Sequence, residues 1–231
     1  MTDREHPAPP QPAGAITEEG LSHEYYWRHM RRRGRATRRT AREILALVRR
    51  FGRPGPLLEL GVGLGFLLRG LRDQLPPATP LYGLDLDPLM IDYARQVTAG
   101  LANVHLLVAD VRAPLPFADA SQQTVCLEHT VHHLDSVDGV FREIARVLAP
   151  DGVCVLIDFD PRCWWSRVFL FGYPWIKRMR IPWPIAEAVY RSLRRSLSFA
   201  ELERLAAAAG LRVVHRARRR LDHLLILARN S

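Results

Sequence analysis

Three carboxylates stand at the ends of three short apolar runs, and glycines follow the first of them. Glu59 lies in PLLELG, and the alternating glycines Gly61 and Gly63 come directly after it. Asp85 ends the run LYGLDL, and Asp110 ends LLVAD. Glycine lets a backbone turn sharply and approach a ligand where a Cβ would collide. Carboxylates at successive strand ends can accept ribose hydroxyls or an amine. The set therefore predicts a site for a nucleoside-like ligand with a cationic amine.

The spacing of the glycines argues against a dinucleotide as this ligand. The dinucleotide pattern G-x-G-x-x-G would need a glycine at position 66, where Phe66 stands, and the third glycine comes one residue early at Gly65. Glu59 would also place a negative charge beside a pyrophosphate, which is unfavourable. A tight turn without ligand is the structural alternative for the glycines, and a helix cap for each single carboxylate. Three carboxylates beside one glycine turn favour binding.

Histidines follow the fourth apolar run, in the segment CLEHTVHHL. His129, His132 and His133 come after Glu128. Histidine titrates near neutral pH and suits a base that takes a proton from a hydroxyl or an acidic carbon. We assign this role to His129, while His133 is interpreted as a residue that caps or packs the next turn. No metal site is expected, because no cysteine or paired carboxylate accompanies the histidines.

Apolar runs and amphipathic stretches alternate from Leu57 onward, which predicts an α/β fold with a largely parallel, doubly wound sheet. Strands are expected over 56–61, 80–86, 103–110, 123–129 and 152–159, and helices over 66–75, 88–100 and 137–150. A further helix is expected over 198–210, with Ser198 as its N-cap. The closing runs 211–218 and 221–229 are close enough to pair as an antiparallel hairpin.

The segments outside this alternation have different compositions. The prolines of residues 1–18 predict a flexible tail, residues 19–55 a helical region, and residues 56–231 one domain. Within that domain, residues 160–196 form a lid-like insertion that carries four of the five tryptophans. The insertion could line a pocket for an apolar acceptor, contact a membrane or pack as a small core of its own. We expect Phe171 and Trp175 to form the acceptor pocket or its entrance.

Composition and charge limit the class of protein. The chain has 231 residues, of which 48% are hydrophobic and 25% charged, so a disordered or fibrous protein is excluded. The 33 basic residues exceed the 24 acidic ones by nine, which makes phosphates, anionic lipid or acidic substrates candidate partners. The start has no signal-peptide character, and no run of about 18 apolar residues is present. These features predict a cytoplasmic protein.

Several motifs resemble a known family. They are ELGVGLG, YGLDLDPLMIDYAR, ADVRAPLPFADAS, LEHTVHHL and FREIARVLAPDGVCVLID. In these motifs the chain is similar to class I S-adenosylmethionine (SAM)-dependent methyltransferases, of the small-molecule type grouped with the ubiquinone and menaquinone methyltransferases. The resemblance is strong over 57–159 and weak beyond. It implies a Rossmann-like, seven-stranded sheet whose last strand is antiparallel, with SAM as cofactor.

The resemblance also implies roles for the residues at the strand ends. The implied cofactor-binding residues are Glu59, Gly61, Gly63, Asp85, Leu86, Asp110, Val111 and Glu128. The first strand end would hold the methionine moiety, the second the ribose hydroxyls and one face of the adenine, and the third the adenine edge. Glu128 and His129 would lie beside the methyl donor.

The resulting hypothesis is a SAM-dependent methyltransferase acting on a small, hydrophobic or lipid-like acceptor, with peripheral membrane contact left open. The isoelectric point of about 10.3 keeps an RNA methyltransferase as an alternative. Nucleic acid is the less favoured partner, because Cys126–His129 is unlike the Asn-Pro-Pro-Tyr motif and no RNA-binding module is appended. A non-catalytic basic binding protein with the same fold is the second alternative.

Overall fold

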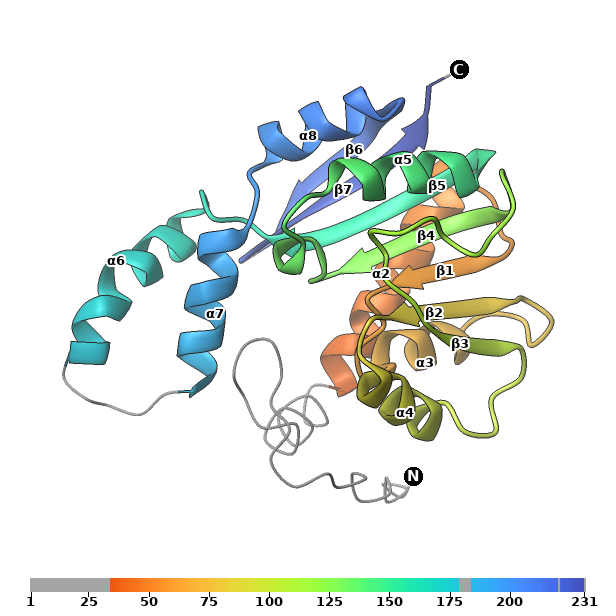
Figure 1. The fold of residues 1–231 in the computed structure, drawn as a ribbon, viewed down its shortest axis with the longest axis horizontal. Helices are drawn as coiled ribbons and strands as arrows, with labels where there is room; N and C mark the ends of the chain where they lie inside the picture. Colours follow the sequence, from red (N-terminus) through yellow and green to blue (C-terminus); the bar gives the residue numbers. More distant parts are fainter. Residues whose placement is uncertain (1–33, 179–183, 220, 231) are drawn as a thin grey trace.

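One seven-stranded sheet organises the described part of the chain (Figure 1). The computed structural model describes residues 34–178, 184–219 and 221–230. The strand order is β3-β2-β1-β4-β5-β7-β6. The strands are β1 (Leu57–Leu60), β2 (Leu81–Asp85), β3 (Val104–Val108), β4 (Gln122–Glu128), β5 (Leu148–Phe159), β6 (Leu211–Arg218) and β7 (Asp222–Arg229). The first five are parallel, and β7 is antiparallel to both of its neighbours, β5 and β6. The predicted fold class, with its antiparallel last strand, is confirmed.

Helices cover both faces of the sheet, as expected for a doubly wound fold (Figure 1). On one face α2 (Gly34–Phe51), α3 (Phe66–Arg72) and α4 (Pro88–Val97) bury residues such as Ile44, Leu68 and Ile91 against the strands. On the other face α5 (Asp138–Val147) and α8 (Phe199–Ala208) do the same with Phe141 and Leu202. The parallel strands are apolar on both sides because both of their faces are covered.

Two further helices, α6 (Trp164–Arg178) and α7 (Pro184–Arg195), follow β5 and project beyond the carboxyl ends of the parallel strands (Figure 1). The hydroxyl of Tyr173 on α6 donates to Glu187 on α7 at 2.8 Å. Arg195 of α7 donates to the carbonyl of His133 at 3.2 Å and pairs with Asp135 at 3.0 Å. These contacts connect the helical pair to the 3-10 turn η1 (Val131–His133).

The exposure of the insertion's aromatic residues tests one of its three interpretations, that of a small core of its own. Trp164, Trp165, Phe171 and Trp175 are 50% to 78% exposed, whereas Tyr173 is buried. The reason is that α6 packs against α7 through the side that carries Tyr173, so Trp164, Phe171 and Trp175 face away from α7. The interpretation as a self-contained aromatic core is therefore wrong for the four exposed residues.

Some predictions fall outside the described residues. They concern the tail 1–18, residues 19–33 of the expected helical region, and Trp183. The boundaries of the three predicted segments remain predictions. Among residues 34–178, 184–219 and 221–230, no helix combines the length and the apolar character needed to cross a bilayer.

Candidate functional site

The glycine loop forms the centre of the candidate site, between β1 and α3. Gly61 and Gly63 both have left-handed backbone angles, with φ of 74° and 50°. Residues with a Cβ rarely adopt this conformation. A Cβ on Gly61 would lie 2.5 Å from the hydroxyl of Thr130, whereas a Cβ on Gly63 would meet nothing within 4 Å. The loop is thus packed against the segment after β4 on one side and open on the other.

Asp85, at the end of β2, holds the glycine loop in place. One of its carboxylate oxygens accepts the Gly63 backbone N–H at 2.8 Å, and the other accepts the N–H of Asp87 at 3.0 Å. The side chain of Leu86 next to it is 50% exposed, although apolar side chains of this size are usually covered. The two predicted cofactor positions on β2 therefore lie beside the loop.

Glu59 is a buried carboxylate that lacks a partner for one of its oxygens. Its side chain is 3% exposed, and Oε2 has no hydrogen-bond partner among the described residues. Burial raises the pKa of Glu59 well above its usual range, and the nearby Glu128 and Asp85 raise it further. A buried carboxylate of this kind is costly unless a cation or a proton neutralises it. The site therefore fits a ligand that brings a positive charge, as the amine of SAM does.

Asp110 lies near the same edge, two residues beyond the partner of Asp85 in the β2–β3 pairing. Its carboxylate is engaged by the Arg112 guanidinium at 2.9 Å, and this contact lowers the pKa of Asp110. The side chain of Val111 is buried. An adenine amine would have to share Asp110 with Arg112, a partner that the sequence analysis did not foresee.

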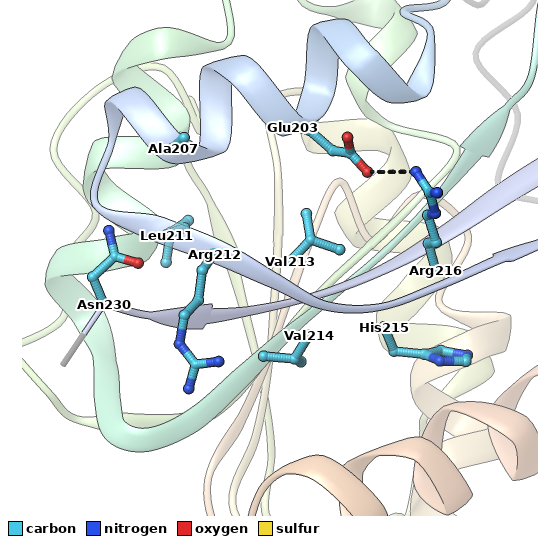
Figure 2. A pocket seen from close by; sticks show the side chains of 9 residues that line it. All are labelled: Glu203, Ala207, Leu211, Arg212, Val213, Val214, His215, Arg216 and Asn230. Atoms are coloured by element: carbon cyan, nitrogen blue, oxygen red, sulfur yellow. Dashed lines mark hydrogen bonds and ion pairs between the residues drawn. The ribbon is translucent and has the colours of Figure 1, made fainter.

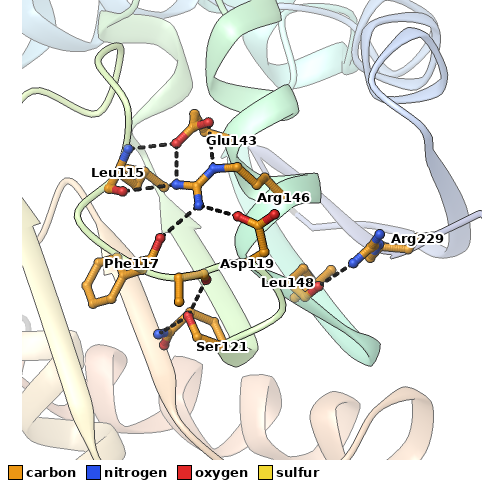
Figure 3. Close-up of polar contacts among 10 residues, drawn as sticks. Leu115, Phe117, Asp119, Ser121, Glu143, Arg146, Leu148 and Arg229 are labelled. Atoms are coloured by element: carbon orange, nitrogen blue, oxygen red, sulfur yellow. Dashed lines mark hydrogen bonds and ion pairs between the residues drawn. The ribbon is translucent and has the colours of Figure 1, made fainter.

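Arg146 of α5 fixes the loop that follows Asp110 and Val111 (Figure 3). Its guanidinium donates to the carbonyls of Leu115 and Phe117 at 3.0 and 2.8 Å, and to Glu143 and Asp119 at 2.7 and 2.8 Å. Glu143 in turn accepts the Leu115 backbone N–H at 2.7 Å. These bonds anchor a long loop to the helix that covers it, so the end of β3 has a defined position.

The histidines lie at the end of β4, with two different environments. His129 has a left-handed φ of 54°, and its side chain is 28% exposed, with Nε2 at 3.9 Å from Asp222. His132 is buried, and its Nδ1–H donates to Asp158 at 2.6 Å. The Asp158 carboxylate also accepts the backbone N–H groups of His132 and Phe159. Of the two, His129 is the one that a ligand can reach.

Burial lowers the pKa of His132 and outweighs the attraction of Asp158. Burial by itself would raise the pKa of Asp158, but His132 and nearby donors outweigh it and the pKa is lowered. With both pKa values lowered, His132 is a neutral imidazole and Asp158 an ionised carboxylate. In that state Nδ1 of His132 carries the proton and Nε2 is the basic atom.

A side-chain nitrogen or oxygen from each of His129, His132 and Asp158 lies within 4.8 Å of the others. No metal site was expected from the sequence, because no cysteine or paired carboxylate accompanies the histidines there. In the structure Asp158 supplies a carboxylate. Two ligands of one tetrahedral zinc ion, with bonds of about 2.0–2.1 Å, stand roughly 3.3 Å apart. The 2.6 Å between His132 and Asp158 is instead the length of a hydrogen bond. That the site holds no metal stays a prediction.

Asp158 and His223 are site residues that the sequence analysis missed. Asp158 and His223 are direct partners in the antiparallel β5–β7 pairing. His223 is fully buried, and neither ring nitrogen has a partner among the described residues. The position of Asp158 at a strand end was a usable signal, since it follows the same rule as Asp85. His223 gave no such signal, because only the strand order brings the start of β7 to this edge.

The buried histidines predict a dependence of stability on pH. Burial lowers the pKa of His223, as it does that of His132, although Asp158, Asp160 and Asp222 oppose the shift. Below the unfolded pKa of about 6.5, the unfolded chain then binds more protons, so the free energy of unfolding decreases as the pH falls. We expect the melting temperature to drop between pH 7.5 and 5, and His223→Leu to reduce that drop. An equal drop in both proteins would contradict the assignment.

Other surface depressions lie elsewhere. Figure 2 shows one over the edge strand β6 and α8, where Glu203 pairs with Arg216 at 3.4 Å. Three strands separate β6 from β1 in the sheet. Another depression is lined by Phe51, Arg53 and Asp151, among other residues. Neither contains a predicted site residue.

The fold of the described residues is similar to that of solved methyltransferases. A solved SAM-dependent methyltransferase from Aquifex aeolicus has a similar fold, with a TM-score of 0.62 and 20% sequence identity. The superposition covers 81% of this chain and 88% of that one.

Sequence similarity agrees with the likeness in fold. Residues 58–156 match the family model of the methyltransferase domain named Methyltransf_11. The chain is 36% identical over 110 residues to a malonyl-[acyl-carrier protein] O-methyltransferase of Hahella chejuensis, covering 48% of this chain and 38% of that protein. It is 31% identical over 131 residues to the ubiquinone/menaquinone biosynthesis C-methyltransferase UbiE of Desulfotalea psychrophila, covering 54% and 52%. The chain thus spans about half, or less, of these relatives. The predicted resemblance is confirmed, and SAM is supported as the cofactor.

Proposed function

We propose that this protein transfers a methyl group from SAM to a small apolar acceptor. The observation that carries the proposal is the buried Glu59, whose unpartnered oxygen lies in a group of carboxylates beside an open glycine loop. A cationic amine would neutralise this carboxylate, while a pyrophosphate would be repelled by it. Because Glu59 alone identifies only a cation, the ribose and adenine contacts of the neighbouring strand ends are needed to specify SAM.

The strand ends would divide the cofactor among them. Glu59 would accept the amine, Asp85 the ribose hydroxyls, and Leu86 would pack on the adenine. Asp110 and the backbone of Val111 would contact the adenine edge, and Glu128 would lie near the sulfonium. When bound, SAM supplies an electrophilic methyl group with a good leaving group. The residues therefore contribute mainly by aligning donor and acceptor.

His129 is the proposed base for an acceptor that must lose a proton. Its side chain is partly exposed at the end of β4, next to Glu128, and packs against Phe159 with 4.6 Å between ring centroids. An alcohol or an acidic carbon would give its proton to the imidazole as the methyl group is transferred. Neutral His132, held by Asp158, would support the turn that carries His129.

An apolar acceptor is supported by the surroundings of His129. Phe159 packs against this histidine with 4.6 Å between ring centroids, and α7 contacts the histidine turn through Arg195. The names of the two relatives point to different acceptors, a quinone precursor in one and an acyl group on a carrier protein in the other. We favour the first kind because an apolar ring can use the aromatic surroundings.

Binding of SAM is the direct test of the proposal. We expect a dissociation constant in the micromolar range, and we expect Asp85→Ala to weaken binding by about 1–3 kcal/mol, because the ribose hydroxyls lose a charged acceptor. Asp92→Ala, at an exposed position on α4, is the matched control. Calorimetry that shows binding of NAD and none of SAM would overturn the proposal. Mass spectrometry of a co-purified ligand would identify the acceptor.

A further inference from the structure

The helix α6 has an apolar face that no described element covers. This aromatic face consists of Trp164, Val168, Phe171 and Trp175, which are 48% to 78% exposed. These residues follow a spacing of four, three and four residues, so they form one stripe along the helix. Soluble proteins rarely expose a patch of this kind without a binding function. The stripe points away from α7, which packs on the side of Tyr173.

The charges beside the aromatic face all have one sign. α6 contains no acidic residue, and Arg167 and Arg178 are exposed. At about 100° per residue, both arginines lie within roughly 70° of the centre of the stripe. Helices that lie in a membrane interface combine Trp and Phe on one face with Arg or Lys at its border. The border residues would then reach phosphate groups while the aromatic rings enter the acyl boundary.

We propose that α6 docks this protein on the surface of an anionic phospholipid bilayer through its aromatic face. A bilayer satisfies the apolar stripe and the arginines together. A second copy of the chain would bring Arg167 and Arg178 against their own counterparts, which like charges oppose. RNA would satisfy the arginines, and its bases can stack on aromatic rings, but it would leave Val168 without an apolar partner.

Docking would place the candidate site at the bilayer surface. α6 begins five residues after the end of β5, at the same edge of the sheet as Asp158 and the histidine turn. If the proposed function is correct, docking would keep the candidate site near a bilayer in which an apolar acceptor dissolves. The docking itself requires neither SAM nor an acceptor, so its test does not depend on methyl transfer.

The first experiment measures co-sedimentation of the full chain with two kinds of vesicle. One contains phosphatidylcholine alone, and in the other roughly one lipid in three is the anionic phosphatidylglycerol. We expect binding to the anionic vesicles to be about tenfold stronger or more. Phe171→Ser with Trp175→Ser should weaken this binding at least about tenfold, because apolar area is lost. Phe171→Leu with Trp175→Leu keeps an apolar face and should stay within about threefold of the original protein. Unchanged melting temperatures show that the variants are folded.

A charge-reversal pair tests the role of the arginines. Arg167→Glu with Arg178→Glu should lower binding to anionic vesicles about tenfold or more, since two attractive charges become repulsive. Arg42→Glu with Arg49→Glu makes the same change in net charge at exposed positions of α2 and should have a much smaller effect. Equal losses in both variants would mean that net charge, and not α6, governs binding.

Three results would overturn the proposal. The first is the absence of vesicle binding by the original protein, and the second is binding that the serine variant retains. The third is that the original protein binds RNA or a second copy of itself but no vesicles, and that the serine variant loses this binding. Another partner would then cover α6. Analytical ultracentrifugation and a filter-binding assay with single-stranded RNA detect these two partners.

Discussion

Glu59→Gln is expected to weaken the binding of SAM by about two orders of magnitude, without a comparable loss of stability. The buried carboxylate would neutralise the ammonium group of the ligand, and an amide cannot. Removing one partner of a buried, hydrogen-bonded charge pair typically costs about 2–5 kcal/mol. Calorimetry with SAM measures the effect, and Asp92→Asn at an exposed position on α4 is the matched control.

The raised pKa of Glu59 adds a second readout to this prediction. Burial, Glu128 and Asp85 favour the protonated carboxyl when no ligand is bound, whereas an ammonium group favours the ionised form. Binding should therefore release a proton at any pH below the raised pKa. In that range the affinity for SAM should fall by up to about tenfold for each unit by which the pH is lowered. Calorimetry in buffers of different ionisation enthalpy detects the proton, and Glu59→Gln should release none. Equal affinity and equal proton release in both proteins would remove Glu59 from the site.

His129→Ala is expected to lower turnover by about 10²–10⁴ with a hydroxyl acceptor, while SAM affinity stays nearly unchanged. The reason is that the imidazole would take the proton of the acceptor during transfer, but would make no contact on which the cofactor depends. Single-turnover kinetics with isotopically labelled SAM measures the methyl-transfer step, and calorimetry measures affinity separately.

His105→Ala is the matched control, because this histidine is exposed on β3 and stacks on Tyr82 with 5.1 Å between ring centroids. It should retain full turnover. If His129→Ala is also fully active, His129 is not the base, and a loss of activity confined to His132→Ala would be attributed to the buried pair of His132 with Asp158. Full activity of both variants would leave transfer to alignment alone.

The strand ends were the most predictable part of the site. Hydrophobic alternation placed Glu59, Asp85 and Asp110 at the ends of parallel strands, and such ends meet at one edge of a doubly wound sheet. The structure does bring Glu59, Asp85 and the glycine loop together. The ion pair between Asp110 and Arg112 was not predicted, because it depends on the conformation of the loop in which both residues lie.

The other differences arise where side chains meet through tertiary structure. The helix after the glycine loop was expected to continue to residue 75 but ends at Arg72. The buried Arg72 guanidinium donates to the carbonyls of Thr79 and Pro76, and these bonds hold a loop that periodicity does not describe. The pair of His132 with Asp158 likewise joins residues 26 positions apart. Neither contact has a local sequence pattern.

The contact between Gly61 and Thr130 has a consequence for protein engineering. The Thr130 hydroxyl donates to the Leu60 carbonyl at 3.0 Å and occupies the space where a Cβ on Gly61 would stand. Loop exchange is a common way to change which acceptor an enzyme takes, and the turn after β4 would be an obvious segment to exchange. A bulkier residue brought to position 130 would press on the backbone of the glycine loop. Acceptor preference and cofactor affinity therefore cannot be redesigned here as independent modules.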